Sequence, residues 1–403
     1  MQFIFGLIIL LLPWASQFET RNEADMIYLD NAATTRPCRE AAETVAKAMT
    51  ELWGNPSAGH TPGRKAMAAL EQARERVLKA LGPGSERGSL TFTSGGTEAD
   101  NLALFGAAKK QIHRGRHIIS SKVEHEAVLK CLEELKTEGW AVTLLDPDAS
   151  GRIPVEAVGE ALQPDTVLVS LMLVNNETGG INEIPRVAEL LRERGSRALL
   201  HTDAVQAFLK LPFTPAGLGA DLITLSSHKI CGPKGAGALW CRNGLRLPPL
   251  LRGGGQEGGL RSGTEPMPAI LGFGAAAEAI SADKDHTARY AALRRILEEE
   301  LPGALFLGDP EACAPHICSL SFPGARAEPL MNELDSKGIC VSRGSACARG
   351  RRSHVLEAMG LPAKVIDGAL RISFGPENTP EEVREACACL REAVDRYFPG
   401  AGK

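Results

Sequence analysis

The sequence predicts an α/β protein, with a mostly parallel, doubly wound sheet in a large domain and a smaller α+β domain after it. From Met26 to about residue 285, short apolar runs bounded by turn residues alternate with helical patterns. That alternation is typical of βαβ units, which build parallel sheets with helices on both faces. Beyond residue 285 the pattern changes to a charged amphipathic helix and a helix–strand alternation. A chain of 403 residues is also too long for one core of ordinary size, which favours two domains.

Each expected element follows from a local pattern. A helix ending at residue 81 is indicated by apolar residues on one face, and it stops at Gly82-Pro83, a common helix end. The apolar residues of that face are Ala66, Leu70, Ala73, Val77 and Leu81. The smaller domain is expected to hold a helix over 288–301 and a strand near 317–322. The strands expected in the sheet are 89–93, 117–121, 141–145, 166–172, 198–202, 222–226 and 237–240.

Composition excludes several classes of function. The hydrophobic fraction of 44% and the charged fraction of 23% are those of an ordinary globular protein. A net charge of −4 without a Lys/Arg block argues against a nucleic-acid surface, because phosphate binding needs clustered cations. The 10 cysteines are too sparse for a disulfide scaffold and show no zinc-ligand spacing, so no metal site is predicted. Free thiols in a reducing cytoplasm are the expectation.

The first 25 residues differ from the rest. Residues 3–14 form a short apolar run without a preceding Lys or Arg. A membrane span needs about 20 apolar residues, so no stable span is expected. The run could be the core of a signal peptide that lacks its cationic segment, or the start codon could be misassigned, with Met26 opening the strand-like IYLD. Residues 1–25 are therefore left outside the predicted fold.

Polar residues that follow the strands are the candidates for a binding site, because ligands of open α/β sheets lie beyond the carboxyl ends of strands. Gly96 and Thr97 follow the first sheet strand and open a helix, an arrangement that suits a phosphate or an ordinary capped turn. Asp203 follows the strand 198–202 and could pair with a protonated pyridine nitrogen or cap a helix. The alternatives remain open for each residue taken alone.

Two further segments suggest covalent chemistry. Lys229 follows the strand 222–226 among small hydroxyl residues and glycines, where its amine could form an imine. A surface lysine is the alternative there, and Lys234 is a rival. Cys347 lies in a glycine-rich, arginine-flanked segment that would favour an accessible thiolate, although most cysteines are buried and inert. The other cysteines are expected to be inert.

In their order along the chain, these segments resemble the cysteine desulfurases of the NifS/IscS type, within the class V aminotransferase-like pyridoxal-phosphate enzymes. The resemblance extends from Met26 to about Phe398. Its motifs are YLDNAATT (28–35), GNPSAGHTPGRKA (54–66), TSGGTEADN (93–101), VEHEAV (123–128), VNNETG (174–179), HTDAVQ (201–206), SSHKICGPKGAGAL (226–239), RSGTE (261–265), GSAC (344–347) and ALRISFG (369–375). It implies a fold type I transferase and a homodimer. It also implies a large cofactor-binding domain over 37–284 and a small domain formed by 26–36 and 285–403.

The resemblance also implies a role for each matching residue. Lys229 would hold pyridoxal 5'-phosphate as a Schiff base, His125 would stack on its ring, and Cys347 would take sulfur from L-cysteine as a persulfide, leaving L-alanine. Asn31 would line the substrate pocket, and Arg371 would bind the substrate carboxylate. The cofactor-binding residues would be Gly96, Thr97, Asn176, Asp203, Gln206, Ser226, His228, Lys229 and, from the other subunit, Thr264. The expected sulfur acceptor is an iron–sulfur scaffold or another protein.

The chain departs from the family pattern in places. Gly258 stands where the family usually has Arg, Pro376 stands where Arg is common, and the segment after Cys347 is about two residues short and rich in arginine. These departures leave three alternatives: a cysteine desulfurase, a selenocysteine lyase, or a catalytically weak class V aminotransferase-like protein.

Overall fold

The computed structural model describes residues 26–344 and 352–401, and its largest element is a seven-stranded sheet. The strands lie in the order β2-β8-β7-β6-β5-β3-β4. Only β8 runs antiparallel to its neighbours, and the remaining strands share one direction. The strands are β2 Gly88–Thr93, β3 His117–Ser121, β4 Ala141–Leu145, β5 Thr166–Ser170, β6 Leu199–Asp203, β7 Leu222–Ser226 and β8 Gly237–Arg242. The carboxyl ends of six strands therefore meet at one edge.

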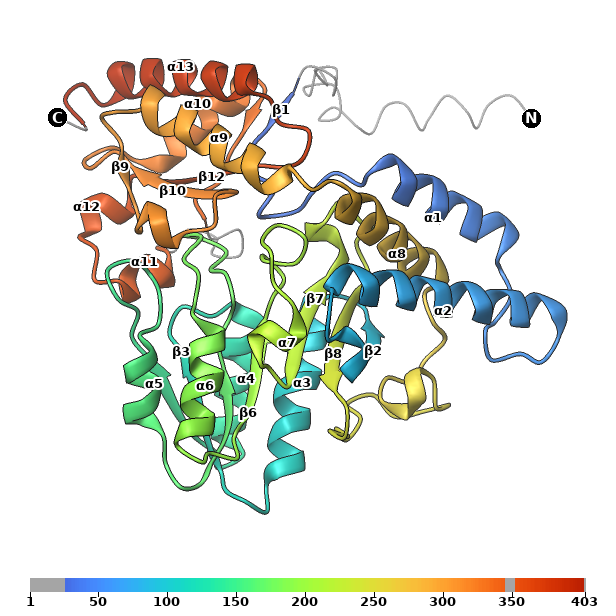
Figure 1. Cartoon of the computed structure of the whole chain (residues 1–403). Helices are drawn as coiled ribbons and strands as arrows, with labels where there is room; N and C mark the ends of the chain where they lie inside the picture. Colours follow the sequence, from blue (N-terminus) through green and yellow to red (C-terminus); the bar gives the residue numbers. More distant parts are fainter. Residues whose placement is uncertain (1–25, 345–351, 402–403) are drawn as a thin grey trace, which may run out of the picture.

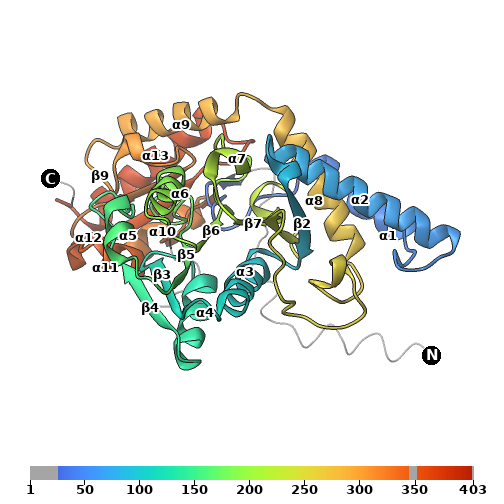
Figure 2. The same cartoon turned by 60° about the horizontal axis from the view of Figure 1, so that its bottom comes forward.

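Helices cover both faces of this sheet, as Figures 1 and 2 show. In most strands, alternate residues enter two separate apolar clusters, one beneath α3 and α4 and the other beneath α2, α6 and α8. The period of two follows from strand geometry, which turns successive side chains to opposite faces. The helices are α1 Arg39–Glu51, α2 Thr61–Leu81, α3 Gly96–Gln111, α4 Glu126–Thr137, α5 Val155–Ala161, α6 Ile184–Glu193, α7 Pro215–Leu218 and α8 Met267–Ala282. Short 3-10 turns are η2 Ser85–Arg87, η3 Ser227–Lys229 and η4 Glu257–Gly259.

A second body packs at the carboxyl edge of the sheet and has its own apolar cluster (Figure 1). Its antiparallel sheet has the order β12-β10-β9, with α9, α10 and α13 packed on it. The elements are α9 His286–Glu300, β9 Leu305–Phe306, η5 Pro310–Ala312, β10 Ile317–Ser321, α10 Ala327–Ser336, β11 Ile339–Cys340, α11 His354–Ala358, α12 Ala363–Ile366, β12 Ala369–Ser373 and α13 Pro380–Tyr397.

The N-terminal segment joins this second body rather than the large sheet. Strand β1, Ile27–Tyr28, pairs in parallel with β11, and Asp30 forms a bridge with Ser373, the last residue of β12. Ile27 and Leu29 belong to the same apolar cluster as α9 and α13. The segment that follows then crosses to the carboxyl edge of the large sheet, where the backbone N–H of Thr35 donates to the carbonyl of His228.

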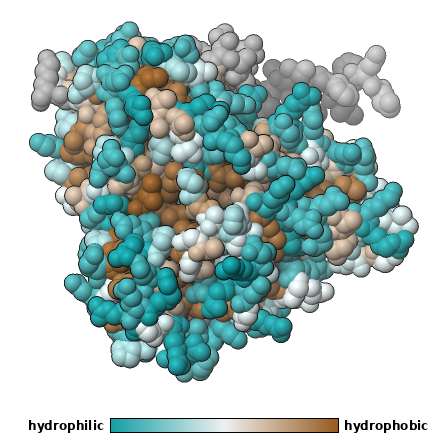
Figure 3. Space-filling view, viewed as in Figure 1, coloured by the Kyte–Doolittle hydropathy of each residue, from teal (hydrophilic) through white to brown (hydrophobic). Residues whose placement is uncertain are grey.

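The predicted fold class is confirmed, and each strand expected in the sheet is present within two residues of its expected bounds. The antiparallel direction of β8 is the feature that the pattern did not reveal, because β8 follows β7 after a short loop without a crossover helix. Hydrophobic residues gather near the middle of the face in Figure 3, between the second body and the helices of the sheet. Within the described ranges, no helix has the length and apolar character of a membrane span.

Candidate active site

The candidate site lies at the carboxyl edge of the large sheet, where several expected residues meet. Asp203 is the last residue of β6, Ser226 is the last of β7, and Lys229 ends the turn η3 directly after β7. Since β6 and β7 are adjacent and parallel, their ends place these groups at one edge. His125 reaches the same region from the start of α4.

Lys229 is held by the backbone of the N-terminal segment. Its Nζ donates to the carbonyl of Ala32 at 2.6 Å and to that of Ala33 at 2.7 Å. Burial disfavours the ammonium form, and the nearby cations of Arg371 and Lys210 add to this, so the pKa of Lys229 falls to about 7. A large share of the lysine is thus a free amine near neutral pH, the form that reacts with carbonyl groups.

Asp203 and His125 face this amine as a buried acid and a half-buried base. Asp203 accepts from the backbone N–H of Val205 at 2.9 Å, and burial raises its pKa against the lowering effect of His125 and Lys229. Nδ1 of His125 accepts from the N–H of Ala127 at 3.1 Å, which caps α4, and burial lowers the pKa of the imidazole. His125 is therefore largely uncharged and can present its ring as a flat surface.

A cradle for an anion is built where α3 begins. A Cβ added to Gly96 would lie 3.1 Å from Val205 Cγ2 and 3.6 Å from Ser226 Cβ, so the backbone approaches the strand ends closely because Gly96 has no side chain. The Ser226 hydroxyl is buried and has no hydrogen-bond partner in the described structure. Thr97 lines a cavity of about 440 Å³ together with His125. An oxyanion here would meet the free N–H groups of a helix start and the Ser226 hydroxyl.

His228 belongs to the same edge but carries no charge near neutrality. Its Nδ1 lies 3.2 Å from the Thr34 hydroxyl, and burial beside Lys229 lowers the pKa of the imidazole to about 4. It can therefore orient or donate to an anion as a neutral ring, without adding a full positive charge.

Arg371 lies on β12 and joins three parts of the chain. Its guanidinium donates to the carbonyls of Asn176 and Gly344 and forms an ion pair with Asp30 at 2.7 Å. Its Nε is buried without a partner in the described structure. A substrate carboxylate would have to compete with Asp30 for this guanidinium or bind at the unused Nε.

The other expected residues are placed differently. The side-chain N–H₂ of Asn31 bonds to Tyr28 O, Ser373 O and Asn378 Oδ1, which commits it to the fold. Gln206 donates to Ala32 O, and its own Oε1 is buried without a partner. Asn176 contributes its backbone carbonyl to Arg371, and Thr264 is exposed before α8. Cys347 lies outside the described residues.

Several polar groups of the site were not singled out from the sequence. Asp30 pairs with Arg371, while Lys210, Asp100 and Glu124 are buried close enough to act electrostatically on the site. Asp30, Asp100 and Glu124 lie inside the quoted motifs, so the sequence could have indicated them. Lys210 lies four residues after Gln206 and outside every motif, and no periodicity in the sequence predicts that it is buried.

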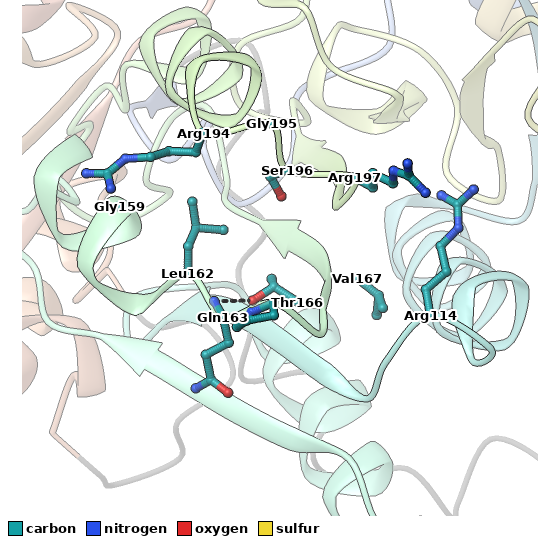
Figure 4. Close-up of a pocket in the computed structure, with 11 residues that line it drawn as sticks. Arg114, Gly159, Leu162, Gln163, Thr166, Val167, Arg194, Gly195, Ser196 and Arg197 are labelled. Carbon is teal, nitrogen blue, oxygen red and sulfur yellow. Dashed lines mark hydrogen bonds between the residues drawn. The ribbon is translucent and has the colours of Figure 1, made fainter.

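A larger cavity, of about 580 Å³, lies at the opposite edge of the sheet (Figure 4). It is lined by Arg114, Arg194 and Arg197, each of which follows a helix or precedes the start of a strand. Figure 4 shows that Arg194 points away from the other two, so the three guanidinium groups do not converge. Arg114 and Arg194 lie just beyond the C-termini of α3 and α6, where a cation is favourable beside the free carbonyl groups without any ligand.

Comparisons with family profiles, curated sequences and solved structures agree on the family of this chain. The profile of the family aminotransferase class V matches residues 27–385. A cysteine desulfurase of Cereibacter sphaeroides is 43% identical over 379 residues, covering 92% of this chain and 96% of that protein. Among solved structures, a NifS-like protein superposes with a TM-score of 0.85 at 34% identity, covering 92% of this chain and all of the other. A structure described as SspA in complex with cysteine gives a TM-score of 0.77 at 34% identity, covering 88% and 100%.

Proposed function

Since the chain belongs to the class V aminotransferase family, we propose that it is a cysteine desulfurase that uses pyridoxal 5'-phosphate to convert L-cysteine to L-alanine. The relatives named above support the activity, and the cysteine complex of one solved neighbour supports the substrate. The observation that carries the proposal is the half-buried amine of Lys229, about half of it neutral at pH 7 and facing the Asp203 carboxyl.

The residues at the carboxyl edge fit this cofactor. The orphaned Ser226 hydroxyl and the bare backbone at Gly96 suit its phosphate, with Thr97 and His228 beside them and Thr264 expected from a second subunit. Asp203 suits its protonated ring nitrogen, and His125 suits its ring face. Gln206 and Asn176 are proposed to contact the ring oxygen or the substrate side of the cofactor, and Gln206 has a free buried acceptor there. When bound, pyridoxal phosphate withdraws electrons from the substrate's Cα.

Different residues of the chain would bind the substrate, move the proton and take the sulfur. Arg371, with Asn31 near it, would hold the substrate carboxylate, and Lys229 would remove the proton from Cα after giving up its covalent link. The thiolate of Cys347 would attack the substrate sulfur, so that the S–Cβ bond breaks and a Cys347 persulfide forms. One proton delivered to Cβ and one returned to Cα of the remaining three-carbon fragment would complete alanine.

The test is a set of single substitutions assayed with cysteine and a reductant. Cys347→Ala should abolish sulfide release while the visible cofactor band is retained, and Lys229→Ala should abolish both. Cys389→Ala removes a half-buried thiol of α13 and is the matched control. Sulfide release that persists in Cys347→Ala would overturn the assigned nucleophile, and a strong preference for selenocysteine in the same assay would reassign the protein as a selenocysteine lyase.

We also propose a homodimer that hands sulfur to an acceptor protein, such as an iron–sulfur scaffold, in the cytoplasm. The dimer is supported by large apolar side chains exposed on and between α1 and α2, where Met49 and Trp53 are 67% and 72% exposed. Exposed apolar surface of this kind commonly marks a protein interface. The separate apolar cluster of the second body supports the small domain assigned to 26–36 and 285–403. Sedimentation of the purified chain tests the dimer.

A further inference from the structure

Asp100 is a buried carboxyl that no step of the proposed reaction uses. It lies on α3 and is 1% exposed. On the sheet beneath α3, Thr224 of β7 is the register partner of Asp203, and His201 stands two residues before Asp203 on β6. Because side chains two apart on a strand share a face, these three groups lie on one face of the sheet. Asp100 covers them from the helix above.

A chain of hydrogen bonds runs beneath Asp203 and ends at Asp100. The Thr224 hydroxyl bonds to the Asp100 carboxyl and lies 3.0 Å from His201 Nε2. His201 Nδ1 lies 2.8 Å from the Ser170 hydroxyl, which closes the chain on β5. The remaining oxygen of Asp100, Oδ1, has no hydrogen-bond partner in the described structure and is 3.7 Å from His201 Nε2.

Asp100 and Asp203 have different charged neighbours. Asp100 is faced by Asp203, Glu124 and the Cys131 thiol, and His201 is no counter-ion because burial lowers its pKa to about 3. Asp203, in contrast, is faced by His125 and Lys229 and accepts a backbone N–H. Two buried carboxylates side by side cannot both ionise cheaply, so one of them keeps a proton. Lys229, which is partly ionised near pH 7, and the backbone N–H of Val205 favour the anion at Asp203.

We propose that Asp100 carries the proton of this two-carboxyl pair, leaving Asp203 as its single anion, ready to bind a protonated ring nitrogen. Asp100 is thus a positioning residue, and it acts on the cofactor only through Asp203. The neutral chain of Ser170, His201 and Thr224 holds the acid in place and adds no charge. The role assigned to Asp203 rests on the proposed function, whereas the location of the proton does not.

The test is carbon NMR of the full-length protein labelled with ¹³C at aspartate carboxyl groups, at about pH 7, where an ordinary aspartate is ionised. One resonance is expected at the position of a protonated acid. It should disappear in Asp100→Asn and persist in Asp203→Asn, because burial alone still disfavours ionisation of Asp100. Asp335→Asn, at an exposed site, should remove a carboxylate resonance only.

Each other outcome overturns the proposal. An acid resonance that is absent from the wild type, or that survives in Asp100→Asn, shows that Asp100 is ionised. An acid resonance that survives in Asp100→Asn and is lost in Asp203→Asn places the proton on Asp203, and one that is lost in both variants shows that the proton is shared by the pair. Asp203→Ser serves in place of Asp203→Asn if that variant fails to fold, which thermal unfolding reveals. The spectrum needs no turnover, so a failed desulfurase assay and a failed proton assignment are told apart.

Discussion

At the scale of single residues, the site is organised by burial more than by ion pairs. Two carbonyl groups accept hydrogen bonds from the amine of Lys229 and hold it in place. Burial and two neighbouring cations lower its pKa, and this keeps part of the amine uncharged and reactive. Lys229 and Asp203 were predicted as candidates because each follows an expected strand, and Ser226 was added by the family resemblance. The sequence did not identify Lys210, because burial of a lysine depends on packing between distant segments and leaves no local pattern.

Lys210 offers a test of this electrostatic control. Its Nζ is buried without a hydrogen-bond partner in the described structure, and it is one of the two cations that lower the pKa of Lys229. Lys210→Met removes a like charge, so the pKa of Lys229 should rise by roughly half a unit or more. The pH midpoint for imine formation between cofactor-free protein and added pyridoxal phosphate should move up by the same amount.

The matched control for this change is Lys234→Met, which removes an exposed lysine of the glycine-rich turn after Lys229. Its midpoint should stay near that of the wild type, while Lys210→Arg should keep the wild-type value because it keeps the charge. A midpoint that stays fixed in Lys210→Met would show that burial and Arg371 alone set the pKa of Lys229.

A second single-residue prediction concerns Arg371 and the substrate carboxylate. A bidentate guanidinium recognises a carboxylate better than an ammonium does, so Arg371→Lys should weaken cysteine binding. The expected loss in kcat/KM is at least about 30-fold, corresponding to roughly 2 kcal/mol for a truncated buried charge partner. Steady-state kinetics with cysteine measure it, and Arg295→Lys on the outer face of α9 is the control. An unchanged KM would mean that Arg371 serves only to join Asp30, Asn176 and Gly344.

At the scale of elements, periodicity predicted where strands and helices lie. It did not predict which side-chain contacts fix the connecting loops. The segment around η4 illustrates the difference. Gly258, singled out because the family usually has Arg there, has φ +62° and is exposed, a conformation that strains any residue with a side chain. The preceding residue, Glu257, is what anchors the segment, and its sequence context is unremarkable.

Glu257 should therefore matter far more than an average surface carboxylate. It accepts from Arg74 through both oxygens and from the backbone N–H of Phe92, and its side chain is 3% exposed. Glu257→Ala leaves the Phe92 N–H unpaired and leaves Arg74 with only the more exposed Glu71 as a charge partner, so we expect a loss of about 2 kcal/mol in the free energy of unfolding. Urea unfolding measures it. Glu43→Ala breaks an exposed pair with Arg39 and should cost less than about 0.5 kcal/mol.

At the scale of the whole molecule, the site exists because three separate stretches of chain meet at one edge of the sheet. The N-terminal segment supplies the carbonyls for Lys229 and the carboxylate for Arg371, the sheet supplies Asp203 and Ser226, and the second body supplies Arg371 itself. Patterns within one stretch predicted the sheet and the motifs. They could not predict this meeting, because the pairing of β1 with β11 joins residues far apart in sequence.

The buried acids near the site should make the free energy of unfolding depend on pH. Glu124 is fully buried, accepts from Ser121 Oγ and the Met172 N–H, and has a pKa raised by burial to about 8. Between about pH 4.3, the unfolded value, and the folded pKa, the native state holds a proton that the unfolded state releases. Glu124 therefore lowers the free energy of unfolding as pH rises through this window, by on the order of 1.4 kcal/mol per unit.

Glu124→Gln, which resembles the protonated acid and cannot ionise, should remove this slope. Relative to wild type, the variant should gain stability steadily from about pH 5 to about pH 8, with the difference levelling off above the folded pKa. Urea unfolding at several pH values measures the difference, which isolates Glu124 from Lys229 and Lys210, whose lowered pKa values act in the opposite direction above about pH 7. Glu126→Gln changes the adjacent exposed carboxylate and should give a flat difference. A flat difference for Glu124→Gln as well would mean that Glu124 ionises in the folded protein, and the carboxyl cluster near Asp203 would then carry more than one negative charge.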